Sequence, residues 1–361
     1  LHSTSRRQRQ MCIRDRLKDI LLDENFLKAI ISSLLLISLG FILRYAKIVG
    51  NKTKQVICFI VLKISLPVLA FTAFLSDFDQ QKFKDDVIIF ILSLVFFIVL
   101  LAIGNLIFRK YGKEKRHIYA IFITVGQLTF FSIPVLKAVY GDEVMIMANM
   151  VTFSFRFILY VYCYFIIAKL SFNKENVKTS LKHFLLNPIM IAMFLGLVIW
   201  LTQNVMYHIA IDNHSYSLFR IDKTLPFLYR ILHALQSTST PLAMLVIGFS
   251  LGESKIIDAL KDKGAWLCSI LRVFIAPLFV LFVLVVFCIT KLYSFSELAA
   301  ASLVIGFAAP LSAVVNTYCL NFKNEAIRAS RICFLSTLLC ILSIPILYVL
   351  IHLFVGWGVF Y

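Results

Sequence analysis

The feature that most constrains the fold of this chain is a series of apolar runs separated by mostly short polar loops. A helix needs about 20 apolar residues to cross the hydrocarbon core of a bilayer, and only helices and closed barrels satisfy the backbone there. The pattern therefore predicts an all-α polytopic membrane protein with ten transmembrane helices. The ten runs are residues 25–43, 56–75, 87–108, 117–140, 144–168, 184–204, 225–251, 265–290, 296–320 and 331–355.

Composition and loop charge agree with this prediction. Hydrophobic residues make up 60% of the chain, against roughly 45–50% in soluble domains. A net charge of +17 would indicate a nucleic-acid ligand in a soluble protein, but here the basic residues lie mostly in loops. The loops after odd-numbered runs hold more Lys and Arg than the others. Because these residues collect on the cytoplasmic side, we predict a multi-pass protein of the cell membrane with both termini outside the cytoplasm.

The first sixteen residues need a separate interpretation. They read LHSTSRRQRQMCIRDR, are basic, and lack the apolar core of a signal peptide. The MCIRDR string that ends them is also what adapter DNA from sequencing libraries encodes when it is translated. We therefore interpret residues 1–16 as a sequencing-adapter artefact or a disordered tail, with a genuine basic arm as the alternative.

Prolines inside the runs indicate an internal repeat. Pro67 and Pro134 lie 67 residues apart, and Pro241 and Pro310 lie 69 apart. The offsets between the two pairs, 174 and 176 residues, nearly agree. Since each half holds five runs, an odd number, the second half inserts upside-down relative to the first, as is common in secondary transporters. The predicted five-helix repeats are residues 17–183 and 184–361.

The fourth and ninth runs each carry a small or polar stretch that leads into a central proline. The stretches read GQLTFFSIPVLKAVYG at 126–141 and VIGFAAPLSAVVN at 304–316. Non-helical backbone survives at membrane depth only where protein or water covers it, and the N-termini of half-helices favour anions. Two such breaks, brought together by the repeat, would form an anion site near the bilayer midplane. A proline kink packed against a neighbouring helix is the alternative.

These stretches also resemble a known family. The first is similar to the G-N-x-G-F-x-G-x-P pattern in the fourth span of the auxin efflux carrier family, which includes bacterial malate permease-like transporters. LLNPIMIAMFLGLVI, TPLAMLVIGFSLGE and FAAPLSAVVNTYCLNF resemble later spans, so the resemblance covers about residues 25–355. It implies two inverted five-helix repeats in a bacterial inner membrane. It also implies that broken helices 4 and 9 cross near the midplane and bind an organic anion such as malate there.

The resemblance assigns candidate substrate-binding residues. Gln127 takes the place of the family Asn, and Thr129 and Ser132 replace two glycines. These departures lengthen one polar side chain and narrow the approach to the backbone, so they bear on the substrate more than on the fold. The residues that match the crossover positions themselves are Pro134, Ala308, Ala309 and Pro310.

Polar and charged residues inside other runs add candidates. Lys63 either neutralises an anionic substrate or extends to the cytoplasmic surface. Arg156 lies near the middle of the fifth run, where it either binds a carboxylate with two hydrogen bonds or packs onto backbone carbonyls. Asn149 and Asn316 either donate to a substrate or link helices.

Two further basic residues and several absences complete the prediction. Arg272 and Lys137 lie nearer the ends of their runs, and we expect them to extend to the membrane surface. No Asp or Glu lies well inside a run, although proton and sodium pumps usually hold carboxylates there. We therefore expect a uniporter-like or potential-driven carrier. The sequence has no His, Cys or carboxylate cluster of metal spacing and no Walker A motif, so we expect no metal, no cofactor and no ATP.

The leading hypothesis is an alternating-access secondary transporter of small organic anions. Its expected partners are that anion and the lipid bilayer, with no nucleic acid, and a homodimer is left open. The alternatives are a non-transporting membrane sensor or scaffold, an ion-coupled symporter of another substrate, and a membrane enzyme. An enzyme would need a His or carboxylate with a polar partner at one membrane face, which the runs do not offer.

Overall fold

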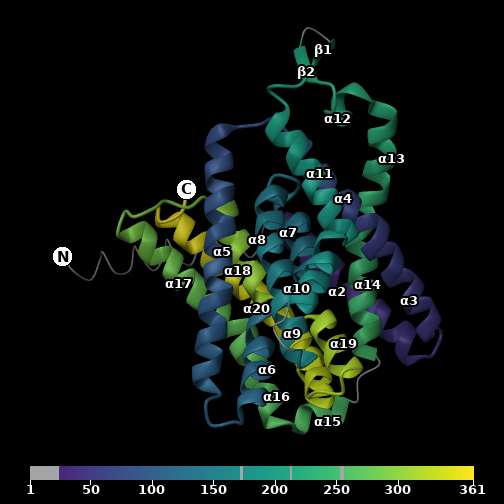
Figure 1. Ribbon diagram of the computed structural model, residues 1–361, viewed down its shortest axis with the longest axis vertical. Coiled ribbons are helices and arrows are strands. Elements are labelled where there is room, and N and C mark those ends of the chain that lie inside the picture. Colours follow the sequence, from purple (N-terminus) through teal and green to yellow (C-terminus); the bar gives the residue numbers. More distant parts are fainter. Residues whose placement is uncertain (1–23, 171–173, 212–213, 253–255) are drawn as a thin grey trace.

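The protein is mostly helical, and its helices pack into one bundle (Figure 1). The computed structural model describes residues 24–170, 174–211, 214–252 and 256–361. The suspected artefact at residues 1–16 lies outside the described residues. The first-half helices, with π-helical segments marked η, are α2 Glu24–Tyr45, α3 Asn51–Ile60, η1 Val61–Ser65, α4 Leu66–Thr72, α5 Gln80–Ile107, α6 Lys113–Thr124, η2 Leu128–Ser132, α7 Ile133–Tyr140, α8 Met145–Phe157, η3 Ile158–Cys163 and α9 Tyr164–Ile167.

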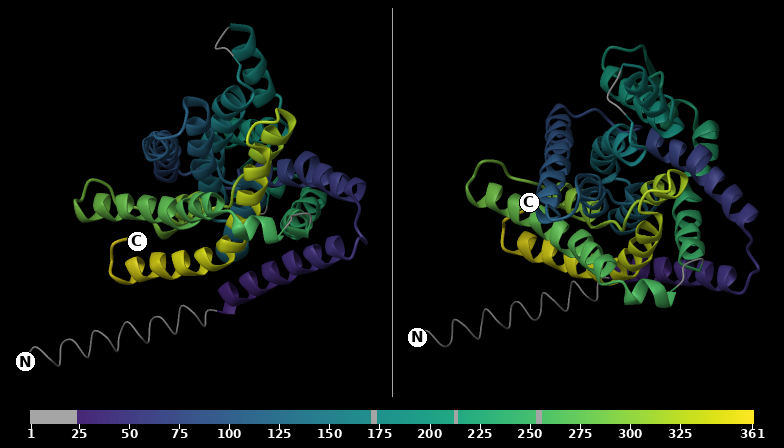
Figure 2. Two further views of the ribbon diagram at one scale, coloured as in Figure 1. Left: turned by 90° about the horizontal axis from the view of Figure 1, so that it is seen from below. Right: turned by 60° about the horizontal axis from the view of Figure 1, so that its bottom comes forward.

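The second half of the sequence is also mostly helical. In both views of Figure 2, α17 runs alongside part of α20, with which it is in contact. The helices are α10 Lys174–Leu185, α11 Pro188–Thr202, α12 Ile221–Thr224, α13 Pro226–Ser237, α14 Ser239–Gly252, α15 Ile256–Lys261, α16 Lys263–Ile270, η4 Leu271–Ile275, α17 Ala276–Ile289, α18 Glu297–Ala308, α19 Ala313–Asn321 and α20 Ala326–Gly356.

Helix length and apolar content confirm an all-α membrane protein. Within the described ranges, six helical segments are long and apolar enough to cross a membrane. They are Asn51–Thr72, Phe83–Ile107, Met145–Ile167, Pro226–Gly252, Lys263–Ile289 and Ala326–Gly356. Four shorter apolar helices fall in the other four predicted runs, and they are Ile31–Tyr45, Leu128–Tyr140, Pro188–Thr202 and Glu297–Ala308. Two of these are short because the fourth and ninth runs each contain a non-helical gap.

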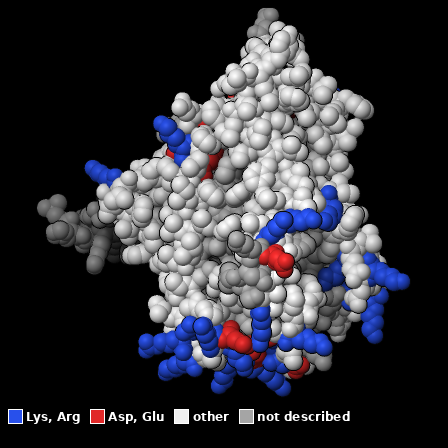
Figure 3. Space-filling model, in the orientation of Figure 1, with Lys and Arg blue, Asp and Glu red and all other residues white. Residues whose placement is uncertain are grey.

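Basic residues gather at one end of the molecule. Figure 3 shows Lys and Arg at the lower end, which Figure 1 identifies as the region of α6, α15 and α16. The opposite end carries an antiparallel hairpin of β1 (His208–Ile211) and β2 (His214–Ser217), and few charged atoms are visible there. This asymmetry is typical of a membrane protein, in which Lys and Arg favour the cytoplasmic side.

One carboxylate fixes the start of α16. Asp262 Oδ1 accepts hydrogen bonds from the backbone N–H groups of Gly264 (3.0 Å) and Ala265 (3.1 Å), which satisfies two free donors of the helix N-terminus. Its other oxygen accepts a hydrogen bond from Arg331 Nη1 of α20 at 3.0 Å. Asp262 therefore fixes the position of α16 against α20, ten residues before Arg272.

Helices α2 and α14 touch backbone to backbone. A Cβ atom at Gly40 would lie 2.5 Å from the carbonyl oxygen of Leu245, and one at Gly248 would lie 2.2 Å from that of Ile37. Neither distance is compatible with any side chain. Small residues at a helix interface allow this close approach, which maximises van der Waals contact where lipid provides no hydrophobic driving force.

This contact yields a stability prediction. Gly248→Ala should lower the free energy of unfolding by about 1–3 kcal/mol, the usual cost of overpacking, because the new methyl group would force α2 and α14 apart. The measurement is the thermal unfolding midpoint of the detergent-solubilised protein by size-exclusion chromatography. Gly50→Ala is the control, since a Cβ atom there meets nothing within 4 Å. Equal midpoints for the two variants would contradict the close contact.

Candidate functional site

Two helical segments stop and restart inside the protein. Helix α6 ends at Thr124 and η2 begins at Leu128, while α18 ends at Ala308 and α19 begins at Ala313. In the second gap the residue before Pro310 is extended, with φ −53° and ψ 144°, because a proline ring disfavours the helical conformation of its predecessor. The second gap is thus explained by its proline.

The first gap lies earlier than predicted. The sequence predicts a break at Pro134, but the non-helical residues are 125–127, and Pro134 lies in the first turn of α7. The helix runs without interruption from Leu128 to Tyr140, and Pro134 directly follows the π-helical residues of η2, where wider turns already replace the i→i−4 hydrogen-bond ladder. The prediction of a break at Pro134 is therefore wrong in position by about two helical turns.

The two gaps pair with each other. Gly126 and Leu311 form an isolated antiparallel β-bridge. The N–H of Gln127 donates to the carbonyl of Pro310 at 2.7 Å, and the N–H of Ser312 donates to the carbonyl of Val125 at 3.2 Å. The residues of both gaps are buried. Each stretch of non-helical backbone therefore supplies hydrogen-bond partners that the other needs.

Arg272 binds the ends of both interrupted helices. Its Nε donates to the carbonyl oxygen of Ala309 at 2.8 Å, and its Nη1 donates to those of Ile123 (3.3 Å) and Thr124. The residue is completely buried. The prediction that Arg272 extends to the membrane surface is wrong, because the carbonyl groups at the C-termini of α6 and α18 hold its guanidinium inside the protein.

The guanidinium of Arg272 lies against Gly126. A Cβ atom at Gly126 would be 1.8 Å from Arg272 Nη2 and 2.9 Å from the Cβ atom of Ala309. Nη2 itself is buried and has no hydrogen-bond partner among the described residues. Glycine is therefore required in the first gap by the close approach of a charged side chain.

A second buried arginine contacts the start of the restarted helix. Arg156 Nη2 of α8 donates to Thr129 Oγ1 of η2 at 3.0 Å. Arg156 also interacts with Tyr160, whose hydroxyl accepts a hydrogen bond from Asn187 Nδ2 at 2.8 Å. The Nε atom of Arg156 is buried without a hydrogen-bond partner in the described part of the chain. This network joins two predicted site residues, Arg156 and Thr129.

The other predicted polar residues divide into two groups. Gln127 and Asn149 are buried at 8% and 2% exposure, and Asn149 Nδ2 has no hydrogen-bond partner within the described ranges. Ser132 Oγ of η2 donates to the carbonyl of Ile305 in α18 at 2.9 Å. Asn316 instead accepts a hydrogen bond from Ser330 Oγ at 3.0 Å and so links α19 to α20.

The two lysines lie away from the paired gaps. Lys63 is exposed on η1, where it lines a surface groove with Lys54, Gln55 and Cys58. Lys137, in the last turn of α7, forms an ion pair with Asp142 at 2.9 Å. Both positions agree with lysines that reach the edge of the membrane.

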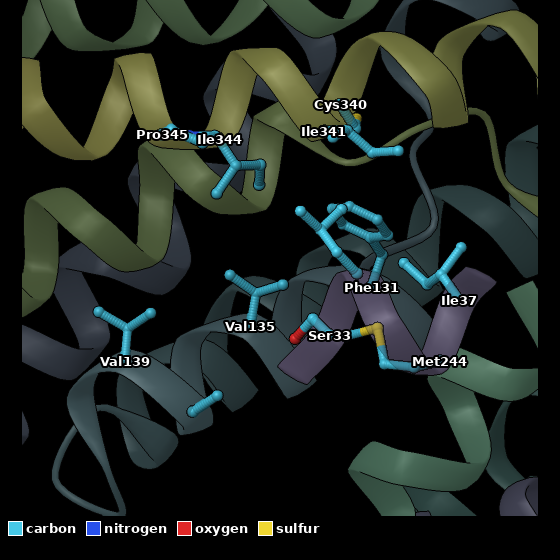
Figure 4. Close-up of a pocket in the computed structure, with 12 residues that line it drawn as sticks. Ser33, Ile37, Phe131, Val135, Val139, Met244, Cys340, Ile341, Ile344 and Pro345 are labelled. Atoms are coloured by element: carbon cyan, nitrogen blue, oxygen red, sulfur yellow. The ribbon is translucent and has the colours of Figure 1, made fainter. Parts of the chain in front are cut away.

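A small apolar cavity lies between α2, α7, α14 and α20. Figure 4 shows the labelled side chains of Phe131, Val135, Met244 and Ile344 around it. Its volume is about 40 Å³, which suffices for one or a few water molecules but not for an organic anion. The buried polar side chains described above lie at the paired gaps and not in this cavity.

A family model described as membrane transport protein matches residues 25–348. This range is nearly the whole chain, and the protein belongs to that family, the auxin efflux carrier family. Its members are membrane transporters and not enzymes. Among curated proteins, none matches the chain.

Proposed function

We propose that the protein is a secondary carrier that moves small organic anions, such as carboxylates, across the cell membrane by alternating access. The observation that carries this proposal is the buried Arg156 beside the first gap. Arg156 forms no ion pair with any carboxylate of the described residues, and its Nε is a buried N–H group without a partner there. An isolated buried charge is costly, and a bound anion would offset that cost.

The substrate site would lie at the start of η2. Arg156 would supply charge, and the side chains of Gln127, Thr129 and Ser132 would supply hydrogen bonds. Arg156 is eleven residues from the start of α8, or about 16 Å along a helix, which is near the midplane of a 30 Å hydrocarbon core. The side chain of Gln127 has no hydrogen-bond partner among the described residues, so it is available to a ligand.

The proposal includes ten spans arranged as two inverted repeats. Besides the paired gaps, spans 2 and 7 support it. The π-helical segment η1 precedes Pro67, and the boundary between α13 and α14 precedes Pro241. These two irregular points meet, since Ser65 Oγ and Thr238 Oγ1 are 2.7 Å apart. Irregular helices in corresponding positions of two halves are typical of carriers built from inverted repeats.

The packing supports a division into two moving parts. Helix α2 packs mainly on α14, and α4 packs on α11, so spans 1, 2, 6 and 7 would form a scaffold. Helix α5 contacts both α6 and α8, and α20 contacts both α16 and α18, and these helices would carry the substrate. The basic end of the molecule in Figure 3 would face the cytoplasm, with both chain termini on the other side.

The driving force would be the membrane potential. The described spans place two arginines and no carboxylate at the gaps, although carriers coupled to protons usually hold a carboxylate at membrane depth. A membrane potential that is negative inside favours outward movement of an anion by about 2.3 kcal/mol per charge per 100 mV. This driving force needs no coupled ion.

Uptake into proteoliposomes tests the proposal. The full chain is offered labelled malate or indole-acetate, with and without an imposed potential, and is compared with Gln127→Ala. We expect saturable, potential-dependent uptake that falls about tenfold or more in the variant, the effect of one lost hydrogen bond to a charged group. Gln203→Ala is the matched control, because this buried glutamine binds the carbonyl of Ser76 (3.2 Å), away from the gaps.

Three outcomes would contradict the proposal. Uptake that requires a sodium or proton gradient would favour the symporter alternative. No flux of either acid would reject the proposed substrate class. Equal losses in Gln127→Ala and Gln203→Ala would show a general effect of removing buried amides and would move the site away from the gaps.

A further inference from the structure

We propose that the guanidinium of Arg272 occupies the position at which an ion-coupled carrier would bind a monovalent cation, so that removal of this side chain exposes a sodium site. The cation site itself does not depend on the proposed function. Only its consequence, that transport needs no coupled cation, rests on the proposed function. It assigns to Arg272 the role of a residue that determines ion coupling.

The ligand set supports this inference. Three backbone carbonyl oxygens converge on the guanidinium, from Ile123 and Thr124 at the end of α6 and from Ala309 just after α18. In inverted-repeat transporters, carbonyl groups of unwound backbone and the C-terminal ends of half-helices coordinate the coupled cation. The oxygens that surround Arg272 are of this kind, and they come from both interrupted helices.

The charge at this point also matches a single cation. The C-terminus of a helix carries a partial charge of roughly −0.5. Two such termini meet at Arg272, so their sum is roughly one negative charge. One guanidinium neutralises it, as one sodium ion would. No carboxylate among the described residues forms an ion pair with Arg272, so the carbonyl groups alone balance its charge.

The side chain is held firmly in this position. It is completely buried, and Nη2 lies against the backbone of Gly126, where a Cβ atom would be only 1.8 Å away. The helix that carries Arg272 is fixed at its start by Asp262, which caps α16 and pairs with Arg331 of α20. The carbonyl oxygens are therefore arranged around a cation that cannot dissociate.

Arg156 provides a natural comparison. It is equally a buried arginine beside the gaps, but it donates to the hydroxyl of Thr129 at 3.0 Å and not to a set of carbonyl groups. It lies near the N-terminal start of η2, where a helix end is partially positive. Removal of the Arg156 side chain therefore leaves no cation site. Removal of the Arg272 side chain leaves three carbonyl oxygens at two helix C-termini, which are partially negative.

The test measures sodium-dependent stability of the purified full chain in detergent. Thermal unfolding of wild type, Arg272→Ala and Arg156→Ala is followed in NaCl and in choline chloride at equal ionic strength. We expect Arg272→Ala to unfold at a lower temperature than wild type in choline and to recover by several degrees in NaCl, saturably, as expected for a ligand of the folded state. Wild type and Arg156→Ala should show no difference between the two salts.

A second variant covers the case in which alanine is too disruptive. Arg272→Lys keeps a tethered cation, so it should fold and show no preference for sodium. The inference is overturned if Arg272→Ala folds and shows equal midpoints in both salts, or if it fails to fold even in high NaCl while Arg272→Lys folds. In both cases Arg272 would only hold the two helix ends together.

The transport assay and this test fail independently. A sodium-dependent midpoint of Arg272→Ala without any flux of malate or indole-acetate would support the cation site and reject the proposed substrates. Potential-driven flux in wild type with no sodium effect in Arg272→Ala would support the carrier and reject this inference.

Discussion

Gly126→Ala is expected to reduce anion uptake at least tenfold and to lower the thermal midpoint of the protein. The methyl group would lie 1.8 Å from Arg272 Nη2 and 2.9 Å from the Cβ atom of Ala309, so the guanidinium and the paired gap cannot both keep their positions. Overpacking of this kind costs about 1–3 kcal/mol even without a charge. Initial uptake rates per reconstituted protein, together with thermal midpoints, provide the measurement.

A double variant makes this prediction specific. If the clash with Arg272 causes the defect, Gly126→Ala combined with Arg272→Ala should be more stable than the sum of the single effects implies. Gly112→Ala is the control, since a Cβ atom there meets nothing within 4 Å. Strict additivity of the two substitutions would mean that Gly126 and Arg272 do not compete for the same space.

Arg156→Met is expected to abolish uptake of organic anions while it preserves folding. Methionine keeps much of the side-chain length and removes the charge, and the loss of a charge-assisted contact to a substrate should lower transport about a hundredfold. The thermal midpoint should stay within a few degrees of wild type, because replacing an unneutralised buried charge by an apolar group of similar shape is often neutral or stabilising.

The comparison of transport with stability separates binding from packing. Thr129→Val removes the hydroxyl that receives the 3.0 Å hydrogen bond from Arg156 but keeps the charge, so uptake should fall by a smaller factor, about tenfold. If Arg156→Met loses stability in proportion to its loss of uptake, the arginine is a packing residue, and the substrate is bound elsewhere.

Features that depend on local sequence could be predicted well. The length of the apolar runs and the loop charges indicate an all-helical membrane protein, because bilayer thickness and charge asymmetry act on contiguous segments. The small residues before Pro310 mark the gap at residues 309–312, since the ring of a proline acts on its immediate predecessor. Family membership could be recognised from the same stretches, and it is confirmed over residues 25–348.

Features that depend on contacts between distant segments could not be predicted. Arg272 is only seven residues into its apolar run, so the sequence alone predicts a long side chain that reaches the membrane surface. Its actual partners, Thr124 and Ala309, lie 148 and 37 residues away in the chain. One sequence signal points to a buried position for Arg272. Like Arg156, it is an arginine inside an apolar run with no acidic partner.

The position of the first gap illustrates a related limit. The sequence predicts a break at Pro134, but this proline follows the π-helical segment η2 and the helix continues through it. The residue that marks the gap is Gly126, and its requirement comes from a side chain on another helix. The roles of Gln127, Thr129, Ser132 and Asn149 in binding stay predictions.

The backbone bridge between the two gaps has a mechanical consequence. The hydrogen bonds from Gln127 to Pro310 and from Ser312 to Val125 fasten one half of the sequence to the other at the centre of the protein. A motion that separated the gaps would leave buried peptide groups without partners, at a cost of about 1–3 kcal/mol for each. If the protein is the carrier proposed above, the two interrupted helices would therefore move together as one body. The boundary between its moving and stationary parts would then run around the paired gaps and not between them.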